Sequence, residues 1–104
     1  MYLGDQSIII GDNVKIGANS TIIDTDCHSI NYLNRRNSTS DKKDTKSKAI
    51  IINDDVLIGS SCIILKGVHI GAHSIIGAGS VVTKDIPENC IAAGNPCKVV
   101  KYLS

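Results

Sequence analysis

Residues 58–86 read IGSSCIILKGVHIGAHSIIGAGSVVTKDI, and an aliphatic residue stands at every sixth position of this stretch. The series comprises Ile58, Ile64, Ile70, Ile76 and Val82; Ile52 extends it backwards, and Ile10, Ile16 and Ile22 repeat it near the start of the chain. A period of six fits neither the 3.6 residues of a helical turn nor the alternation of a simple strand. It predicts a short strand followed by a tight corner, repeated many times.

The residues between the aliphatic positions support this interpretation. Gly directly follows several of them, as in IGDNVK, IGSSCI and IGAGSV, and a small or branched residue stands four places after all of them except Ile22. Gly, Asn and Asp tolerate the backbone angles that corners need, so we expect the Gly and the polar pair after it to form the corners. Three sides of this kind close a triangular coil of about 18 residues, and stacked coils bury the isoleucines in a narrow core.

Composition agrees with a single all-β domain covering residues 1–104. The chain contains 18 Ile but no Phe or Trp, and branched aliphatic residues favour strands. A formal net charge of +1 gives no reason to expect nucleic acid. The apolar runs are much shorter than the roughly 18 residues of a membrane span. Four cysteines without CxxC pairs or zinc-ligand spacing indicate free thiols and a cytoplasmic protein that needs no metal.

The pattern divides the chain into four parts. Residues 1–28 give the first coil, residues 29–49 interrupt it, residues 50–86 give about two later coils, and residues 87–104 form a C-terminal cap. The interruption, which we call the excursion, has no apolar side chain from 34 to 48, so we expect a long polar loop. Its residues 34–48 carry six basic and two acidic side chains. Either the excursion is simply solvated, or it is a lid over a site that binds an anion.

The cap is expected to turn at Pro87, to form a short strand near Ile91 and to turn again at Gly94-Asn95-Pro96. Val99, Val100 and Leu103 have helical spacing, which predicts a short terminal helix or turn over the open end of the coils. Three coils bury little apolar surface and leave open ends. We therefore expect an oligomer.

Several motifs sharpen the interpretation. The segments VLIGSSCIILKGVHIG (56–71), IGAGSVVTKDIP (76–87) and AAGNPCKVV (92–100) resemble the C-terminal half of the sugar and polysaccharide O-acetyltransferases with hexapeptide repeats. DTDCHSI (24–30) resembles the Asp-x-Asp-x-His segment that polysaccharide-modifying members carry before a loop. The resemblance implies a left-handed parallel β-helix of about three coils, acetyl-CoA as co-substrate and a homotrimer with sites between subunits.

The resemblance implies that His28 is the general base. A sugar hydroxyl is a poor nucleophile, and a neutral imidazole can take its proton as the oxygen attacks the thioester of acetyl-CoA directly. His28 stands six residues after Ile22, where the coil opens into the excursion. The alternative without a catalytic role is a partly buried histidine that fills a corner. Asp24 or Asp26 could orient the imidazole or bind the acceptor, and either could equally be a corner residue.

The resemblance also implies a set of coenzyme A contacts. Ser60 would lie near the thioester carbonyl, where a backbone N–H could stabilise the oxyanion. Small side chains at Ala78 and Thr83 would line the pantetheine track. Lys84, Lys98 and Lys101 would meet the phosphates as point charges, although each alone could be an ordinary surface lysine.

The chain also departs from its relatives. Leu57 stands where many have Trp, and Lys98 and Lys101 stand where some have Arg. Longer relatives have further coils before this stretch, often with helices, that supply part of the acceptor site. The chain starts about one coil before His28. It could therefore be a minimal member of the family, a fragment of a longer protein or a trimmed chain.

Three other functions are compatible with the sequence. A carbonic-anhydrase-like enzyme on the same fold would use three histidines around zinc, and this chain has His28, His69 and His73. The sequence pattern around that zinc site is absent here, so His69 and His73 are expected to be exposed strand and corner residues. A non-catalytic or truncated β-helix could serve as an assembly or binding module. An amino-acid acceptor such as serine would fit the chemistry, but serine acetyltransferases carry a long helical N-terminal part.

Overall fold

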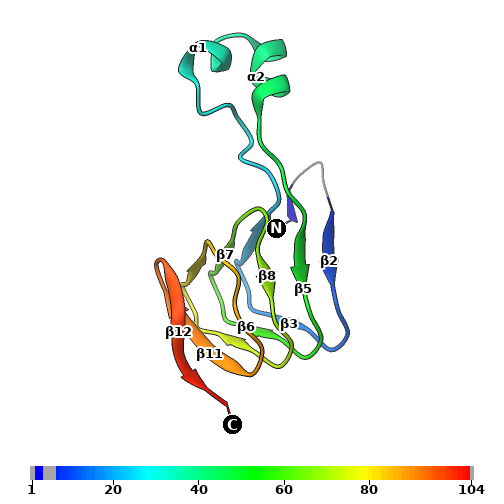
Figure 1. Ribbon diagram of the computed structural model, residues 1–104, viewed down its shortest axis with the longest axis vertical. Coiled ribbons are helices and arrows are strands. Elements are labelled where there is room, and N and C mark those ends of the chain that lie inside the picture. Colours follow the sequence, from blue (N-terminus) through cyan, green and yellow to red (C-terminus); the bar gives the residue numbers. More distant parts are fainter. Residues whose placement is uncertain (1, 4–6, 104) are drawn as a thin grey trace.

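The computed structural model describes residues 2–3 and 7–103 and contains the predicted stack of triangular coils (Figure 1). Each complete coil has three short strands joined by corners. The first coil contains β2 (Ile8–Ile10), β3 (Lys15–Ile16) and β4 (Thr21–Ile23). The second contains β5 (Ile50–Ile52), β6 (Leu57–Ile58) and β7 (Ile63–Ile64), and the third β8 (His69–Ile70), β9 (Ile75–Ile76) and β10 (Val81–Val82).

Strands of successive coils pair in parallel and form the three faces of a prism. The orders are β1-β4-β7-β10, β12-β11-β9-β6-β3 and β2-β5-β8, where β1 is Tyr2–Leu3. The register places equivalent residues above one another, as in Ile16↔Ile58 and Ile58↔Ile76. The period of six therefore corresponds to one side of the prism, and the predicted fold class is confirmed.

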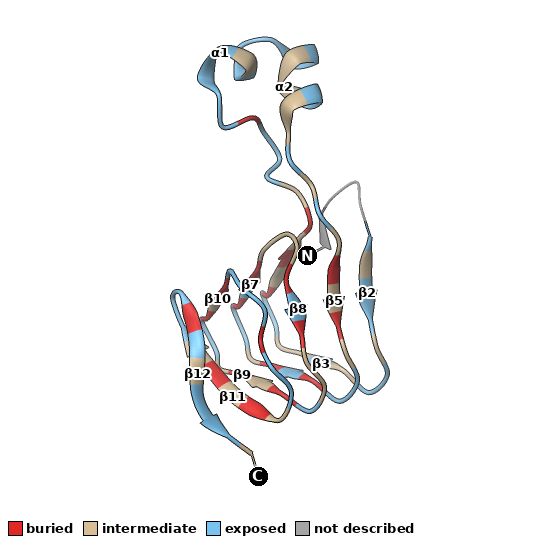
Figure 2. Ribbon diagram, viewed as in Figure 1, coloured by how far each residue is buried: buried red, intermediate tan, exposed pale blue. Residues whose placement is uncertain are grey.

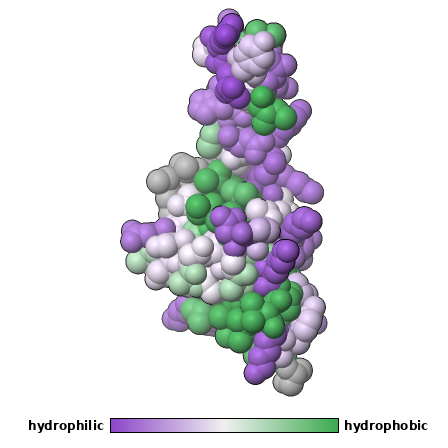
Figure 3. All heavy atoms as spheres, turned by 90° about the vertical axis from the view of Figure 1, so that its left-hand side faces the viewer, coloured by the Kyte–Doolittle hydropathy of each residue, from purple (hydrophilic) through white to green (hydrophobic). Residues whose placement is uncertain are grey.

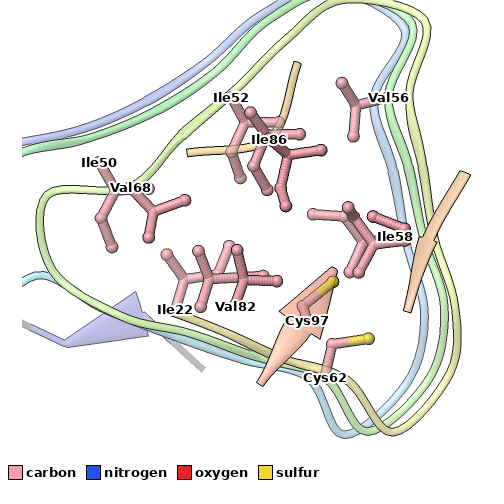
Figure 4. Packing of buried hydrophobic residues seen from close by; sticks show 14 of the residues in the cluster. Ile22, Ile50, Ile52, Val56, Ile58, Cys62, Val68, Val82, Ile86 and Cys97 are labelled. Carbon is pink, nitrogen blue, oxygen red and sulfur yellow. The ribbon is translucent and has the colours of Figure 1, made fainter. Parts of the chain in front are cut away.

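The aliphatic positions of the repeat line the inside of the prism. Ile22, Ile52, Ile58, Ile64, Ile70, Ile76 and Val82 are each at most 1% exposed. Figure 4 looks along the stack and shows a triangular core, with Val56, Cys62 and Val68 at or near its three corners and Ile22 and Val82 along the side between Cys62 and Val68. Outward-facing neighbours in the same strands are more exposed (Figure 2). A narrow aliphatic core of stacked isoleucines is thus the main source of stability.

The structure assigns separate roles to the residues that form each corner. The left-handed residue is the third one after the aliphatic position, as in Asn19, Asp55 and Ser61, whose φ angles are 61°, 57° and 58°, and not the Gly that directly follows this position in many corners. The Gly permits close stacking instead, because a Cβ at Gly59 would lie 2.6 Å from the backbone nitrogen of Ala78. Asn, Asp and Gly are the residues that most readily adopt the left-handed conformation.

The predicted terminal helix is wrong. The chain forms a short strand, β11 (Cys90–Gly94), as expected near Ile91, but then returns as an antiparallel strand, β12 (Cys97–Tyr102). β-branched Val99 and Val100 favour a strand, and the free edge of β11 supplies backbone partners that a helix could not use. The resulting hairpin extends the face formed by β3, β6 and β9 beyond the last coil.

The excursion (residues 29–49) projects from the prism as a separate arm (Figure 1). It contains two short helices that the sequence analysis did not predict, α1 (Tyr32–Arg35) and α2 (Ser38–Asp44). Asn37 caps α2, because its side chain accepts hydrogen bonds from the backbone N–H groups of Thr39 and Ser40. The arm is mostly hydrophilic on the face shown in Figure 3.

None of the four cysteines forms a disulfide bond. Cys62, Cys90 and Cys97 are buried free thiols, whereas Cys27 is exposed. Burial raises the pKa of the Cys97 thiol. Within residues 2–3 and 7–103, no helix has the length and apolar character that a membrane crossing requires.

Candidate functional site

The excursion joins the prism through a narrow neck. Residues 24–26 and 46–48 run antiparallel there: Asp26 N donates to Lys46 O at 2.8 Å, Lys48 N donates to Asp24 O at 2.8 Å, and Thr25 bridges Ser47. The neck lies at the corner of the prism that contains Val68, because Asp26 forms an ion pair at 3.2 Å with Lys66 of the next coil. Residues 27–45, which lie between the two segments of the neck, are therefore outside the hydrophobic core of the prism.

His28 stands just beyond the neck and is not a core residue. A step of six from Ile22 would point position 28 inward, but the excursion intervenes, and Ile52 takes the core position in register with Ile10. The His28 side chain is 69% exposed. Its Nδ1 lies 2.6 Å from Oδ2 of Asp41 on α2, and no described residue bonds to its Nε2. The alternative of a partly buried histidine that fills a corner therefore does not fit the structure.

Two carboxylates of α2 hold the start of the excursion. Besides His28, Asp41 accepts a hydrogen bond through Oδ1 from Ser29 N at 2.6 Å, and its side chain is only 13% exposed. The hydrogen bonds from His28 and Ser29 keep the pKa of Asp41 below its ordinary value. Asp44 accepts from Ser29 Oγ and from Asn34 Nδ2, and these bonds likewise lower the pKa of Asp44. Both acids that the sequence places in residues 34–48 are thus engaged within the arm.

Asp24 and Asp26 lie close to His28 in sequence but have other surroundings. Asp24 is buried, with 1% exposure, and its Oδ1 has no hydrogen-bond partner among the described residues. Asp26 faces Lys66. The described contacts of the His28 ring therefore come from Asp41 and not from either of these residues.

Ser60 and Ala78 are brought together at another corner of the prism. They occupy equivalent places in successive coils, and Gly79 N donates to Ser60 O at 2.9 Å. Both side chains are exposed, next to the buried Cys62. We call this edge, formed by residues 17–20, 59–62 and 77–80, the Cys62 corner.

The other residues of the predicted coenzyme A set lie elsewhere. Thr83 and Lys84 follow β10 and are exposed. They lie at the corner of the prism that contains Val68 and the neck. Lys98 and Lys101 lie on β12 opposite Ala93 and Ile91 and are also exposed. One chain therefore gathers Ser60 with Ala78, but not the whole set.

His28 and the Cys62 corner lie at opposite ends of one prism face. The chain reaches the neck from Gly17–Ser20 by passing along β4, and the equivalent strands β7 and β10 connect the same two edges in the later coils. The length of a prism side thus separates His28 from Ser60 within one chain.

The remaining histidines do not form a metal centre with His28. His69 is exposed on β8, with Nε2 2.9 Å from Asn53 Nδ2, and His73 is exposed at a corner, 3.4 Å from Asp55. In the part of the chain that the structure describes, no group of three His, Cys, Asp or Glu side chains could hold a metal ion. The predicted exposed strand and corner positions of His69 and His73 are confirmed.

A pocket of about 350 Å³ lies between the neck and α2. The residues that line it have hydroxyl, thiol or charged side chains: Thr25, Cys27, Ser38, Asp41, Lys42 and Thr45. Asp41 therefore faces both this pocket and His28. Hydroxyl groups, a carboxylate and an ammonium group are suited to contact a polar ligand.

Asp41 was not among the site residues predicted from the sequence. The available signal was local: Asn37 begins an Asn-Ser-Thr-Ser segment typical of a helix N-terminus, and Asp41 and Asp44 are three residues apart, hence on one helical face. Nothing in the sequence indicated that this face turns back toward residues 28 and 29.

Comparison with known families identifies the repeats. Residues 49–84 match the family described as bacterial transferase hexapeptide (six repeats), and residues 7–27 match the hexapeptide repeat of succinyl-transferase. These matches cover the coils before and after the excursion. They agree with the repeat positions found in the structure.

Individual relatives match almost the whole chain. The galactoside O-acetyltransferase of Escherichia coli (strain K12) is 44% identical over 100 residues, which are 96% of this chain and 46% of the relative. A hexapeptide-repeat acetyltransferase of Vibrio cholerae O1 biovar eltor, solved with acetyl coenzyme A, superposes with a TM-score of 0.87 at 37% identity. The superposition covers 99% of this chain and 53% of the Vibrio cholerae chain. A galactoside acetyltransferase solved with coenzyme A gives a TM-score of 0.86 at 42% identity, over 99% and 48% of the two chains.

The chain thus spans about half the length of the relatives that it matches. Within that half, the likeness extends over both the coils and the excursion. Since these structural neighbours are left-handed parallel β-helices, the β-helix of this chain is left-handed as well.

Proposed function

The chain belongs to the hexapeptide-repeat acetyltransferase family, and from this premise we propose that it transfers an acetyl group from acetyl-CoA to a hydroxyl of a sugar or polysaccharide unit. The observation that carries the proposal is the exposure and the hydrogen bonding of the His28 ring. Its imidazole is exposed beyond the neck, Nδ1 is held by Asp41, and Nε2 has no described partner. An oriented ring with one open nitrogen is what a general base requires.

In the proposed reaction, the acceptor hydroxyl attacks the thioester carbonyl carbon while His28 Nε2 takes its proton. A carbon–oxygen bond forms, and the carbonyl oxygen carries negative charge in the tetrahedral intermediate. When the intermediate collapses, the carbon–sulfur bond breaks, the acetyl group stays on the acceptor, and the proton on His28 passes to the departing thiolate of coenzyme A. No acyl-enzyme forms, and no oxidant or metal is needed.

Acetyl-CoA is proposed to bind along the Cys62 corner. The exposed small side chains of Ser60 and Ala78 leave room for an extended ligand there, and a backbone N–H at Ser60 would stabilise the oxyanion. Lys98 and Lys101 on β12 lie beyond the last coil, where their ammonium groups would meet phosphates. Thr83 and Lys84 would contact the ligand of the neighbouring site, because they lie on the other edge of the face.

The site is proposed to form between subunits of a homotrimer. One chain holds His28 and the Cys62 corner at opposite ends of the β4-β7-β10 face, too far apart for one acetyl transfer. Cyclic packing of three prisms would place the neck of one subunit beside the Cys62 corner of the next. The acceptor would then lie near the polar pocket between the neck and α2.

The test measures free thiol released from acetyl-CoA in the presence of a panel of galactosides, maltose, acidic polysaccharide, nucleotide sugars and serine. We expect acceptor-dependent release with a sugar and none after His28→Ala, with coenzyme A affinity and oligomer mass unchanged. Full activity of His28→Ala would refute the role of His28. Binding of coenzyme A without release for any acceptor would instead favour a non-catalytic module. Activity on CO₂ with bound zinc would favour the carbonic-anhydrase-like alternative.

A further inference from the structure

Asp41 makes two contacts of different kinds, one with each oxygen. Oδ2 lies 2.6 Å from His28 Nδ1, and Oδ1 accepts from the backbone N–H of Ser29 at 2.6 Å. The hydrogen bond from the Ser29 backbone therefore prevents the Asp41 carboxylate from rotating away from the His28 ring. A side chain that was only one half of a surface ion pair would not be held in this way.

We infer that Asp41 is a positioning residue: from α2, it fixes the orientation and the tautomer of the His28 imidazole. This inference rests on the proposed function, in which His28 Nε2 is the base. An ionised carboxylate can only accept hydrogen bonds, so the nitrogen that faces it must carry the proton. Nδ1 is then protonated in the neutral ring, and the lone pair that takes the acceptor's proton is on Nε2.

The surrounding contacts hold α2 in the position that this role requires. One helical turn after Asp41, Asp44 bonds to Ser29 Oγ, and Arg35 Nη1 of α1 donates to Ser29 O at 3.1 Å. The Asn37 cap fixes the start of α2. Ser29 is thus contacted through its N–H, hydroxyl and carbonyl groups, which ties the residue after His28 to both helices.

The charged groups around the ring do not offer a substitute for Asp41. Asp44 is engaged with Ser29 and Asn34, and Asp26 faces Lys66. Arg35, as a permanent cation, strengthens the preference of Asp41 for its ionised form. The excursion consequently carries a functional group, and activity depends on the fold of its two helices.

The decisive variant is Asp41→Asn, with Asp44→Asn as its matched control. Both changes replace a carboxylate of α2 that bonds to Ser29 by an amide of nearly equal size, but only Asp41 contacts His28. An amide presents one acceptor and one donor, so its NH₂ group can face the ring and reverse the tautomer. We expect Asp41→Asn to lower kcat by about 10- to 100-fold. The KM for acetyl-CoA should stay unchanged, and Asp44→Asn should remain within about threefold of wild type.

A second readout is independent of turnover. Nitrogen-15 chemical shifts distinguish a protonated from an unprotonated ring nitrogen, and His28→Ala identifies the His28 signals. We expect an unprotonated Nε2 in the wild type and in Asp44→Asn, and a mixed or reversed tautomer in Asp41→Asn. Hydrogen exchange over residues 29–49 reports whether the two variants loosen the arm equally.

The outcomes separate this inference from the proposed function. Equal losses of activity in the two Asn variants, or an unchanged tautomer in Asp41→Asn, would overturn the positioning role even if His28→Ala is inactive. Full activity of His28→Ala would overturn the proposed function, and the nitrogen shifts would still decide whether Asp41 sets the tautomer.

Discussion

Truncation of Ile58 tests whether the stacked isoleucines hold the prism together. Ile58 is fully buried in β6, and its register places it between Ile16 of the coil before and Ile76 of the coil after. Its neighbour in the same strand, Leu57, faces outward with 46% exposure. Ile58→Ala and Leu57→Ala therefore remove the same number of carbon atoms from adjacent positions on opposite faces of one strand.

The expected magnitudes differ because of burial. At about 0.8 kcal/mol for each buried methylene, loss of the outer carbons of Ile58 costs about 2.4 kcal/mol, and the cavity left in a close-packed core raises this to about 3–4 kcal/mol. Leu57→Ala should cost about 1 kcal/mol, since about half of that side chain is already in contact with water. A loss of about 3 kcal/mol is a large part of the total stability of a domain.

Urea denaturation followed by circular dichroism, at several protein concentrations, measures both free energies of unfolding. The concentration series separates core packing from any contribution of subunit association. Equal costs for the two variants at low protein concentration, or a larger cost for Leu57→Ala, would refute the assignment of the inner and outer faces.

Further predictions concern buried charge, coil spacing and acid. Asp24→Val should raise the free energy of unfolding by about 1–3 kcal/mol, because it removes a buried carboxylate oxygen without a described partner; a loss in urea denaturation would show that the carboxylate has a structural role. Gly59→Ala should destabilise by about 1–3 kcal/mol and weaken coenzyme A binding in calorimetry, because the new Cβ would lie 2.6 Å from Ala78 N; unchanged binding would argue against the Cys62 corner. Because folding lowers the pKa values of Asp41 and Asp44, their ionised carboxylates stabilise the folded arm at pH values above the ordinary pKa of 3.8. This stabilisation is lost as the pH falls through the lower pKa values of the folded state. Hydrogen-exchange protection of residues 29–49 should therefore fall below about pH 4 before that of the coils, and simultaneous loss would contradict this.

The fold could be predicted because the repeat has a direct physical meaning. Each step of six is one side of a triangle, and inward positions must be aliphatic, so the core residues are visible in the sequence. The spacing did not show how each corner divides its tasks. Gly59 serves close stacking, whereas the left-handed backbone falls at Ser61.

The C-terminal segment and the excursion were harder to predict. Val99, Val100 and Leu103 match a helical spacing, but the edge of β11 decides their conformation, and that edge is a tertiary feature. The helices of the excursion bury no residues, so hydrophobic periodicity could not indicate them.

The candidate site was predictable only in part. His28 was found because a motif and a break in the repeat coincide, and the structure places it where the chain leaves the prism. Asp41 stands 13 residues later in a polar segment, and only the return of α2 to the neck brings it to the ring. Local spacing had favoured Asp24 and Asp26, whose side chains meet the core and Lys66 instead.

The most direct test of the central claim mixes two inactive variants. His28→Ala removes the base, and Ala78→Trp fills the exposed track at the Cys62 corner without entering the core. Both variants are unfolded together, refolded as an equal mixture, and checked by native mass spectrometry for mixed oligomers before thiol release is measured.

If each site combines His28 of one subunit with the Cys62 corner of another, about a quarter of the sites in a random mixture contain both intact halves. The account therefore predicts recovery of about a quarter of wild-type activity on mixing. Mixed oligomers that remain as inactive as either variant alone would contradict a site shared between subunits.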